Sequence, residues 1–237
     1  AMLKTNTSLQ TLHLRNTHLD LGGVKAIAEA LKVNKTLRSL RLPGNSIAYA
    51  GAKEFAEALK VNSSLLILDL EDTNIGAAGA SELAGALEVN TTLCELKLGK
   101  NNIDSAGAIE LAEALKVNKS LTRLYLSENS IGSDGGRAFA KALLANTTLK
   151  TLELENNQIG TTNSVYSLAA GELADALKQN QTLISLNLNN NALTSPDAKK
   201  FAEGLEDNKA LTHLYLAGNN IDENVVEKFA RVLRGNT

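Results

Sequence analysis

The chain has 237 residues, 43% of them hydrophobic, and its 24 Lys and Arg residues against 26 Asp and Glu residues give a formal net charge of −2 at pH 7. A chain so close to neutral lacks the excess of positive charge that binds nucleic acid or anionic lipid, and we expect neither as a partner. A single cysteine, Cys94, excludes an intramolecular disulfide framework. The apolar runs are far shorter than the roughly 20 residues of a membrane span. These features predict a cytoplasmic protein in a reducing compartment.

An internal repeat occupies the whole chain. The motif Asn-x-x-Leu recurs at 28-residue spacing, with one irregular step of 34 residues, at Asn6, Asn34, Asn62, Asn90, Asn118, Asn146, Asn180 and Asn208. A period of this length predicts a solenoid, because one repeat cannot bury its apolar face alone and must stack on its neighbours. We therefore expect a single domain over 1–237 with about eight repeats, one of them enlarged at 149–182.

Each repeat begins with a short strand and continues into a helix. In the second repeat, Leu40 and Leu42 alternate with polar residues ahead of Asn45, which is typical of a strand with one buried face. In the segment 51–59 that follows, Phe55 and its apolar neighbours fall on one helical stripe and the charged residues face away. The pattern predicts a parallel sheet lined by helices.

The repeated Asn follows each helix, where the chain has to turn. We expect it to adopt the left-handed conformation that Asn tolerates better than most residues. Seven of these asparagines also begin an Asn-x-Ser/Thr sequence, a glycan acceptor in extracellular eukaryotic proteins, at Asn6, Asn34, Asn62, Asn90, Asn118, Asn146 and Asn180. We favour the structural interpretation, because a glycan at every tight turn would be unusual.

The period, the Asn after the third Leu and the helix pattern Gly-x-x-x-Leu-Ala-x-Ala-Leu-x-x-Asn resemble the ribonuclease-inhibitor-like subfamily of leucine-rich repeats over essentially the whole chain. The resemblance implies an α/β fold: a right-handed solenoid or horseshoe with a parallel β-sheet on the concave face and α-helices on the convex face. Thr17 and Thr73 replace the Asn that ties backbone groups between repeats, and we expect local weakening there. Ribonuclease inhibition is disfavoured, because that inhibitor is cysteine-rich.

Both ends of the chain lie in the same phase of the repeat. Residues 2–6 align with 30–34, and 233–236 close the pattern again. Neither end shows the distinct capping unit that solenoids usually need. We expect the chain to be a fragment of a longer array or multidomain protein.

The variable strand positions predict a partner-binding surface. Side chains that alternate with the buried Leu point to the concave side, and we expect their central column to be the most exposed. It contains His13, Arg41, Asp69, Lys97, Tyr125, Glu153, Asn187 and Tyr215. Our partner-binding candidates are Arg41, Asp69, Lys97, Arg123, Tyr125, Glu153, Asn187 and Tyr215. The first among them are Arg123, Tyr125, Glu153 and Tyr215, because Tyr and Arg on a concave surface most often carry binding energy.

Two alternatives concern this surface and its rim. Arg41, Asp69 and Lys97 on adjacent strands could simply pair with one another, at roughly 0.2–1 kcal/mol per pair. Six extra residues at 161–166 lengthen the loop after one strand, and Tyr166 in it is a candidate rim contact. Insertions in surface loops also occur without any function.

The sequence offers no catalytic, metal or cofactor site. The three histidines, His13, His18 and His213, lie in the first and last repeats and cannot share a metal. Cys94 has no histidine in its own or adjoining repeats to act as a base, and no phosphate-binding glycine motif is present. We expect no enzyme activity, no small-molecule substrate and no cofactor.

The leading hypothesis is a protein–protein interaction module that binds an unidentified protein through its concave face and rim loop. The resemblance implies candidates: an intracellular sensor, or a bacterial effector delivered into a host cytosol. The alternatives are a GTPase-activating protein of the Ran-activator type and a passive spacer or autoinhibitory arm of a larger protein.

Overall fold

The computed structural model describes residues 2–160 and 167–235, in which strands and helices alternate along the chain. The described residues form one eight-stranded parallel sheet in sequence order. Its strands are β1 (Thr11–His13), β2 (Ser39–Arg41), β3 (Ile67–Asp69), β4 (Glu95–Lys97), β5 (Arg123–Tyr125), β6 (Thr151–Glu153), β7 (Ser185–Asn187) and β8 (His213–Tyr215). The predicted α/β leucine-rich solenoid with a parallel sheet is confirmed.

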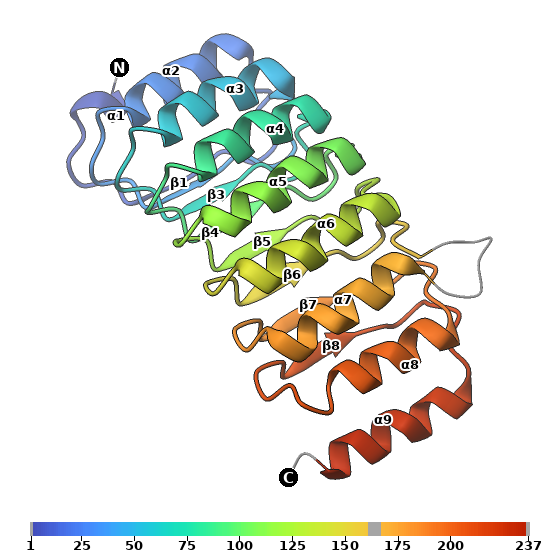
Figure 1. The fold of residues 1–237 in the computed structure, drawn as a ribbon. Helices are drawn as coiled ribbons and strands as arrows, with labels where there is room; N and C mark the ends of the chain where they lie inside the picture. The colour runs from blue at the N-terminus through green and yellow to red at the C-terminus, as the bar shows by residue number, and fades with distance from the viewer. Residues whose placement is uncertain (1, 161–166, 236–237) are drawn as a thin grey trace.

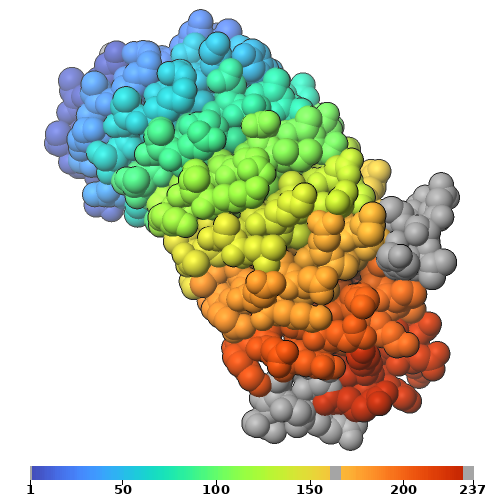
Figure 2. Space-filling model, viewed as in Figure 1, coloured from blue at the N-terminus to red at the C-terminus, as the bar shows by residue number. Residues whose placement is uncertain are grey.

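The helices stack side by side in a second layer that covers one face of the sheet (Figure 1). They are α1 (Met2–Thr5), α2 (Leu21–Leu31), α3 (Ala48–Leu59), α4 (Gly76–Leu87), α5 (Ser105–Val117), α6 (Gly132–Ala145), α7 (Leu168–Gln179), α8 (Ser195–Gly204) and α9 (Glu223–Gly235). Figure 2 shows the repeats as successive bands from one end of the molecule to the other, so each repeat contacts its sequence neighbours.

A continuous apolar core lies between the two layers. The middle leucine of each strand from β2 to β7 is fully buried, as are the large helix residues Phe55, Phe139 and Phe201. At the two ends the equivalent Leu12 and Leu214 are only partly buried, because β1 and β8 are the edge strands and each has a neighbouring strand on one side only. Burial of apolar surface between repeats, at about 25 cal/mol per Å², is therefore the main stabilising term of the stack.

The Asn after each helix is explained by hydrogen bonds and not by backbone conformation. Asn118, Asn146 and Asn180 have φ of −64°, −84° and −75°, so the predicted left-handed conformation is wrong. Instead the Asn118 amide donates to the carbonyls of Leu87 and Asn90 in the preceding repeat (2.7 and 3.1 Å). Its carbonyl accepts from its own turn, from the N–H groups of Ser120 and Leu121 (3.0 and 2.7 Å). The buried Asn thus satisfies backbone groups that the turn would otherwise leave unpaired.

A second row of asparagines follows the strands. Asn129 donates to the carbonyls of Leu98 and Leu126 and accepts from the N–H groups of Asn101 and Ile103. These contacts tie each repeat to the preceding one, as expected from the motif.

Thr73 occupies one position of this row. Its hydroxyl donates to the carbonyl of Leu70 at 2.7 Å, within its own repeat, and the Ile47 N–H of the preceding repeat bonds to the Asn45 carbonyl. At this junction none of the hydrogen bonds among the described residues joins the Thr73 side chain to the preceding repeat, whereas its hydroxyl lies 3.1 Å from the Asn101 side-chain oxygen of the following repeat.

The left-handed conformation lies elsewhere, in the turn that leaves each strand. The first such residue of each repeat has φ between 53° and 71°: Asn16, Gly44, Asp72, Lys100, Glu128, Asn156, Asn190 and Gly218. Most repeats have a further residue with positive φ shortly after it, among them His18, Ala48, Gln158 and Ala192. Within the first set Lys100 and Glu128 are the unusual members, because residues other than Gly, Asn and Asp rarely adopt this conformation.

The six-residue insertion separates β6 from α7. Residues 161–166, Tyr166 among them, lie outside the described residues. None of the helices in the described ranges has both the length and the apolar character needed to cross a bilayer.

Candidate protein-binding surface

The parallel register aligns the variable strand positions into columns. In the strand register Arg41 lies opposite Asp69, Asp69 opposite Lys97 and Lys97 opposite Tyr125. The column continues through Glu153 and Asn187 to Tyr215. The central column predicted from the repeat is therefore confirmed as one contiguous row on the sheet, on the face opposite the helices.

Exposure varies strongly along this column. Tyr215 is 44% exposed, whereas Asp69 is 6% and Asn187 is 9% exposed. The side-chain oxygen of each of the two buried residues accepts from a backbone N–H two residues further on, that of Glu71 and that of Asn189. The prediction that the central column is the most exposed is wrong at these two positions, because a short polar side chain there caps the following turn.

The charged residues of the central column do not pair with one another. Among the ion pairs of the described residues none joins Arg41 to Asp69 or Asp69 to Lys97. Arg41 instead donates through Nε to the Ser39 hydroxyl at 3.4 Å. The alternative that these three residues neutralise each other is therefore wrong. The ion pair between adjacent strands instead joins Glu95 and Arg123, which lie two residues before the central column.

Glu95 organises the centre of the concave surface. It is 7% exposed, and its carboxylate accepts from Arg123 Nε at 2.7 Å and lies 3.6 Å from Lys97 Nζ. Glu95 and Arg123 are register partners on β4 and β5. One buried carboxylate thus holds Lys97 of its own strand and Arg123 of the next strand, and the three side chains carry a formal charge of +1.

Tyr125 completes this cluster. Lys97 Nζ lies 5.0 Å from the centroid of the Tyr125 ring, a distance at which the ring face attracts a cation. Burial, and next the negative charge of Glu95, raise the pKa of the Tyr125 hydroxyl. The hydrogen bond to Glu95 raises the pKa of the Arg123 guanidinium. We call Glu95, Lys97, Arg123 and Tyr125 the central cluster.

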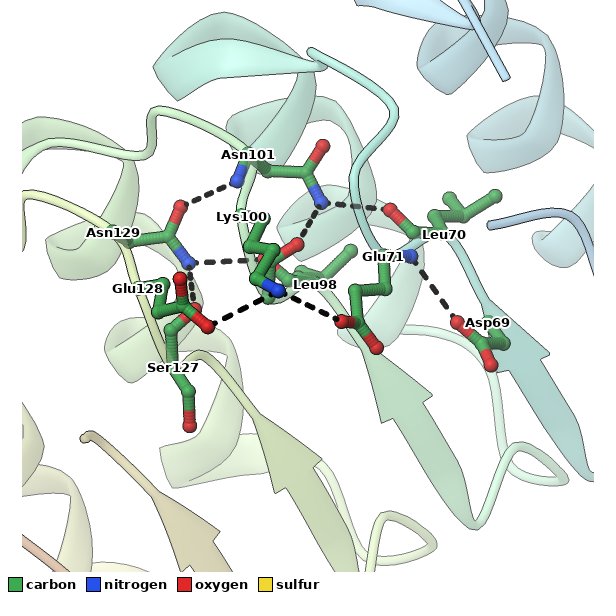
Figure 3. A network of polar contacts seen from close by, with 10 residues as sticks. Asp69, Leu70, Glu71, Leu98, Lys100, Asn101, Ser127, Glu128 and Asn129 are labelled. Carbon is green, nitrogen blue, oxygen red and sulfur yellow. Dashed lines mark hydrogen bonds and ion pairs between the residues drawn. The ribbon is translucent and has the colours of Figure 1, made fainter. Parts of the chain in front are cut away.

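The rim that follows the strands carries a second charged network (Figure 3). Lys100 Nζ lies 3.2 Å from a Glu128 carboxylate oxygen and 4.0 Å from one of Glu71. The hydrogen bond to Glu128 is the largest of the effects that raise the pKa of Lys100. All three side chains are about half exposed, so salt screens these pairs and each contributes little to stability.

Towards the C-terminal end of the sheet the surface is aromatic. Tyr215 stacks on His213 with ring centroids 6.2 Å apart and an interplanar angle of 24°, and both residues are exposed. Glu155 accepts hydrogen bonds from the amides of Asn187 and Asn190 on the intervening repeat. An amide-rich strip therefore separates the central cluster from the aromatic pair.

Sequence reasoning identified three members of the central cluster and missed Glu95. The signal was available, because Glu95 lies two residues before Lys97 on one strand and opposite Arg123 in the 28-residue register. Lys100, Glu128 and His213 were missed as well, because they lie outside the central column. Tyr166 lies outside the described residues.

No metal site emerges from the described side chains. No group of three or more His, Cys, Asp or Glu within 2–160 and 167–235 is arranged to hold a metal ion. Cys94 is a free, half-buried thiol whose Sγ lies 3.3 Å from the Thr92 carbonyl oxygen.

Comparison with known families agrees with this geometry. The family described as Leucine Rich repeat matches residues 5–28, 33–56, 61–84, 89–112, 117–140, 145–162 and 179–202, which is more than half of the chain. The chain belongs to the leucine-rich repeat family. A repeat architecture of this kind suggests a protein-interaction module. No curated protein matches this sequence.

Solved structures of similar fold include two leucine-rich repeat domains. One is leiomodin-1 actin-binding site 2, with 23% identity and a TM-score of 0.41, covering 66% of this chain and 71% of that one. Another is the C-terminal domain of tropomodulin from Caenorhabditis elegans, with 10% identity and a TM-score of 0.46, covering 92% and 93%. Likenesses this distant carry no argument about function.

Proposed function

We propose that residues 1–237 act as one protein-binding domain whose concave surface takes up a protein partner. The observation that carries this proposal is the central cluster, in which Glu95 braces Arg123 at 2.7 Å and Lys97 at 3.6 Å beside Tyr125. Side chains held in place before binding lose little conformational entropy on association, so their contacts contribute more to affinity. Arg and Tyr are also the residues most often found at energetic hot spots.

The other predicted contacts take unequal parts in this proposal. Arg41, Glu153 and Tyr215 extend the surface on either side of the central cluster. Asp69 and Asn187 offer little accessible surface because their oxygens cap the following turns. Tyr166 on the rim loop remains a proposed contact.

We propose a cytoplasmic setting for this domain. Cys94 is a free thiol, which a reducing compartment preserves. The amide nitrogens of Asn34, Asn62 and Asn118 are buried and donate hydrogen bonds to the preceding repeat, so a glycan attached there would break the contacts between repeats.

The test is an affinity capture from eukaryotic cytosol with matched tyrosine variants. The double variant Tyr125→Ala/Tyr215→Ala removes both concave tyrosines. Tyr49→Ala is the control, because Tyr49 lies on α3 and has the same 44% exposure as Tyr215. We expect a specific protein to be captured by the wild type and by Tyr49→Ala and to be lost with the double variant.

The control for this experiment is an unchanged melting temperature of both variants. Retention of the same protein by the double variant would move the binding site away from the concave surface. Equal loss with Tyr49→Ala would show a nonspecific requirement for exposed aromatic rings.

A further inference from the structure

The guanidinium of Arg123 is only partly used within the chain. Its Nε donates to the buried carboxylate of Glu95, and this is the one side of the group that the described residues occupy with a hydrogen bond or ion pair. The side chain remains 42% exposed. A guanidinium has five N–H donors in a planar fork, so the Nη groups of Arg123 remain available at the concave surface.

Within the central cluster two cations share one carboxylate, so one positive charge has no ion-pair partner there. Glu95 is matched by both Arg123 and Lys97, which leaves a formal charge of +1 in the cluster. Arg41, two strands before Lys97, is the natural comparison: its register partner is the buried Asp69, and its Nε is held only by the Ser39 hydroxyl at 3.4 Å. Asp69 lies between Arg41 and Lys97 in the register and forms no ion pair with either of them among the described residues, so Arg41 differs from Arg123 in having no carboxylate that orients its guanidinium.

Tyr125 adds a hydroxyl donor on the same face. It lies two residues after Arg123 on β5, so both side chains point to the concave side. Lys97 packs over its ring at 5.0 Å, which fixes the ring and leaves the hydroxyl without a hydrogen-bond partner among the described residues.

We propose that Arg123 binds an acidic side chain of the protein partner, with its Nη groups donating to the carboxylate and the Tyr125 hydroxyl donating beside them. This inference rests on the proposed function and names the chemistry that the concave surface recognises. Glu95 acts as a positioning residue, because it orients the guanidinium and does not touch the ligand. Fork-shaped guanidinium–carboxylate contacts are among the strongest hydrogen bonds in proteins.

The test is an NMR titration of the intact chain with small capped amino acids. The probes are N-acetyl-glutamate amide for an acidic side chain, N-acetyl-glutamine amide as its neutral control, and N-acetyl-alanine for a chain-terminal carboxylate. The side-chain Nε–H resonances of Arg123 and Arg41 report on the two sites in the same sample. We expect the glutamate probe to shift the Arg123 signal saturably, with a dissociation constant about threefold or more below that at Arg41.

Two variants sharpen the result. Arg123→Lys keeps the charge and loses the fork, and we expect about threefold weaker binding of the glutamate probe, read from the backbone amides of β5 and β6. Tyr125→Phe removes only the hydroxyl, and we expect a smaller loss of affinity. Both substitutions are at partly exposed positions, so circular dichroism melting serves as the check on folding.

Several outcomes would overturn the inference. Equal affinity of the glutamate probe at Arg123 and Arg41 would show that the contact with Glu95 gives Arg123 no advantage. Equal shifts with the glutamine probe would show that Arg123 does not recognise a carboxylate. Tighter binding of N-acetyl-alanine would indicate that Arg123 recognises a chain-terminal carboxylate and not an acidic side chain. None of these results affects capture of a protein through Tyr125 and Tyr215, so failure of this inference and failure of the proposed function are separable.

Discussion

At the scale of single residues, one buried carboxylate determines how the concave surface is charged. Glu95 accepts from Arg123 and lies within ion-pair distance of Lys97, whereas Glu153, two strands further on in β6, forms no ion pair among the described residues. The cost of burying a charge is offset only when hydrogen bonds and countercharges are present. Glu95 therefore has a structural role beside the positioning role that we propose, and its removal has consequences that can be measured.

Replacing Glu95 by Gln is expected to destabilise the chain. The substitution leaves Arg123 and Lys97 close together without a shared countercharge, and we expect a loss of about 1 kcal/mol in the free energy of unfolding, since Arg123 is partly exposed. Urea denaturation measures the effect. Glu153→Gln is the matched control and should change stability by less than about 0.5 kcal/mol. Equal losses in the two variants would contradict a special role for Glu95.

The same substitution is expected to lower the pKa of Tyr125. Burial raises this pKa above the ordinary value of a tyrosine, and the charge of Glu95 adds to the effect, so Glu95→Gln should bring it down. Because the folded pKa exceeds the unfolded one, this group's contribution to stability is complete below about pH 10 and is lost as the pH rises through the folded pKa. The ¹³Cζ resonance of Tyr125, assigned with Tyr125→Phe, reports the titration. An unchanged or higher pKa in Glu95→Gln would refute the electrostatic coupling.

At the scale of elements, the turn after each helix is defined by a side chain that bonds to two repeats. The amide of Asn118 reaches Leu87 and Asn90 of the preceding repeat, while its oxygen accepts from Ser120 and Leu121. The regular spacing of this residue along the chain therefore follows from pairing of buried backbone groups. The extended backbone at Asn118, with φ −64° and ψ 134°, leaves no role for a left-handed conformation.

Substitutions of Asn118 distinguish these two explanations. Asn118→Ala leaves buried carbonyl and N–H groups without partners, and we expect a loss of about 2–4 kcal/mol in the free energy of unfolding. Asn118→Gly should be no better, because glycine restores no hydrogen bond and gains nothing at a negative φ. Denaturant unfolding of both variants is the measurement. Rescue of stability by Gly relative to Ala would favour the conformational explanation.

At the scale of the whole molecule, the repeats form a one-dimensional stack whose inner members are protected on both sides. The strand leucines of β2 to β7 are fully buried, whereas Leu12 of β1 and Leu214 of β8 are only partly buried. In such a stack, stability is approximately a sum of repeat and neighbour terms. The central cluster lies on β4 and β5, within the protected region, so we expect the proposed binding surface to be the most rigid part of the sheet.

Hydrogen exchange should reveal this gradient. We expect backbone amides of β4 and β5 to exchange at least about tenfold more slowly than those of β1 and β8, because the outer strands open locally at lower free energy. Exchange followed by mass spectrometry on peptides of each repeat gives the measurement. Uniform protection from β1 to β8 would indicate that the chain unfolds as one cooperative unit.

The 28-residue period and the alternation around each leucine were sufficient to predict the fold. Both follow from local geometry: side chains alternate across a strand, and a helix presents one apolar stripe. The same period predicted which residues share a column, so Arg41, Lys97, Tyr125 and Tyr215 could be placed on one face from their numbers alone. The subfamily, the GTPase-activating alternative and the role of Tyr166 remain predictions.

Only the tertiary structure decided which charges pair and which side chains are accessible. Asp69 and Asn187 have the same strand phase as Tyr215 but turn their oxygens onto nearby N–H groups, and Arg123 turns towards Glu95 on the preceding strand. A periodic pattern defines the position of each Cα and the face of each side chain. Rotamers and ion-pair partners depend on distances across neighbouring strands, where one carboxylate can satisfy several competing donors and only the packed geometry selects among them.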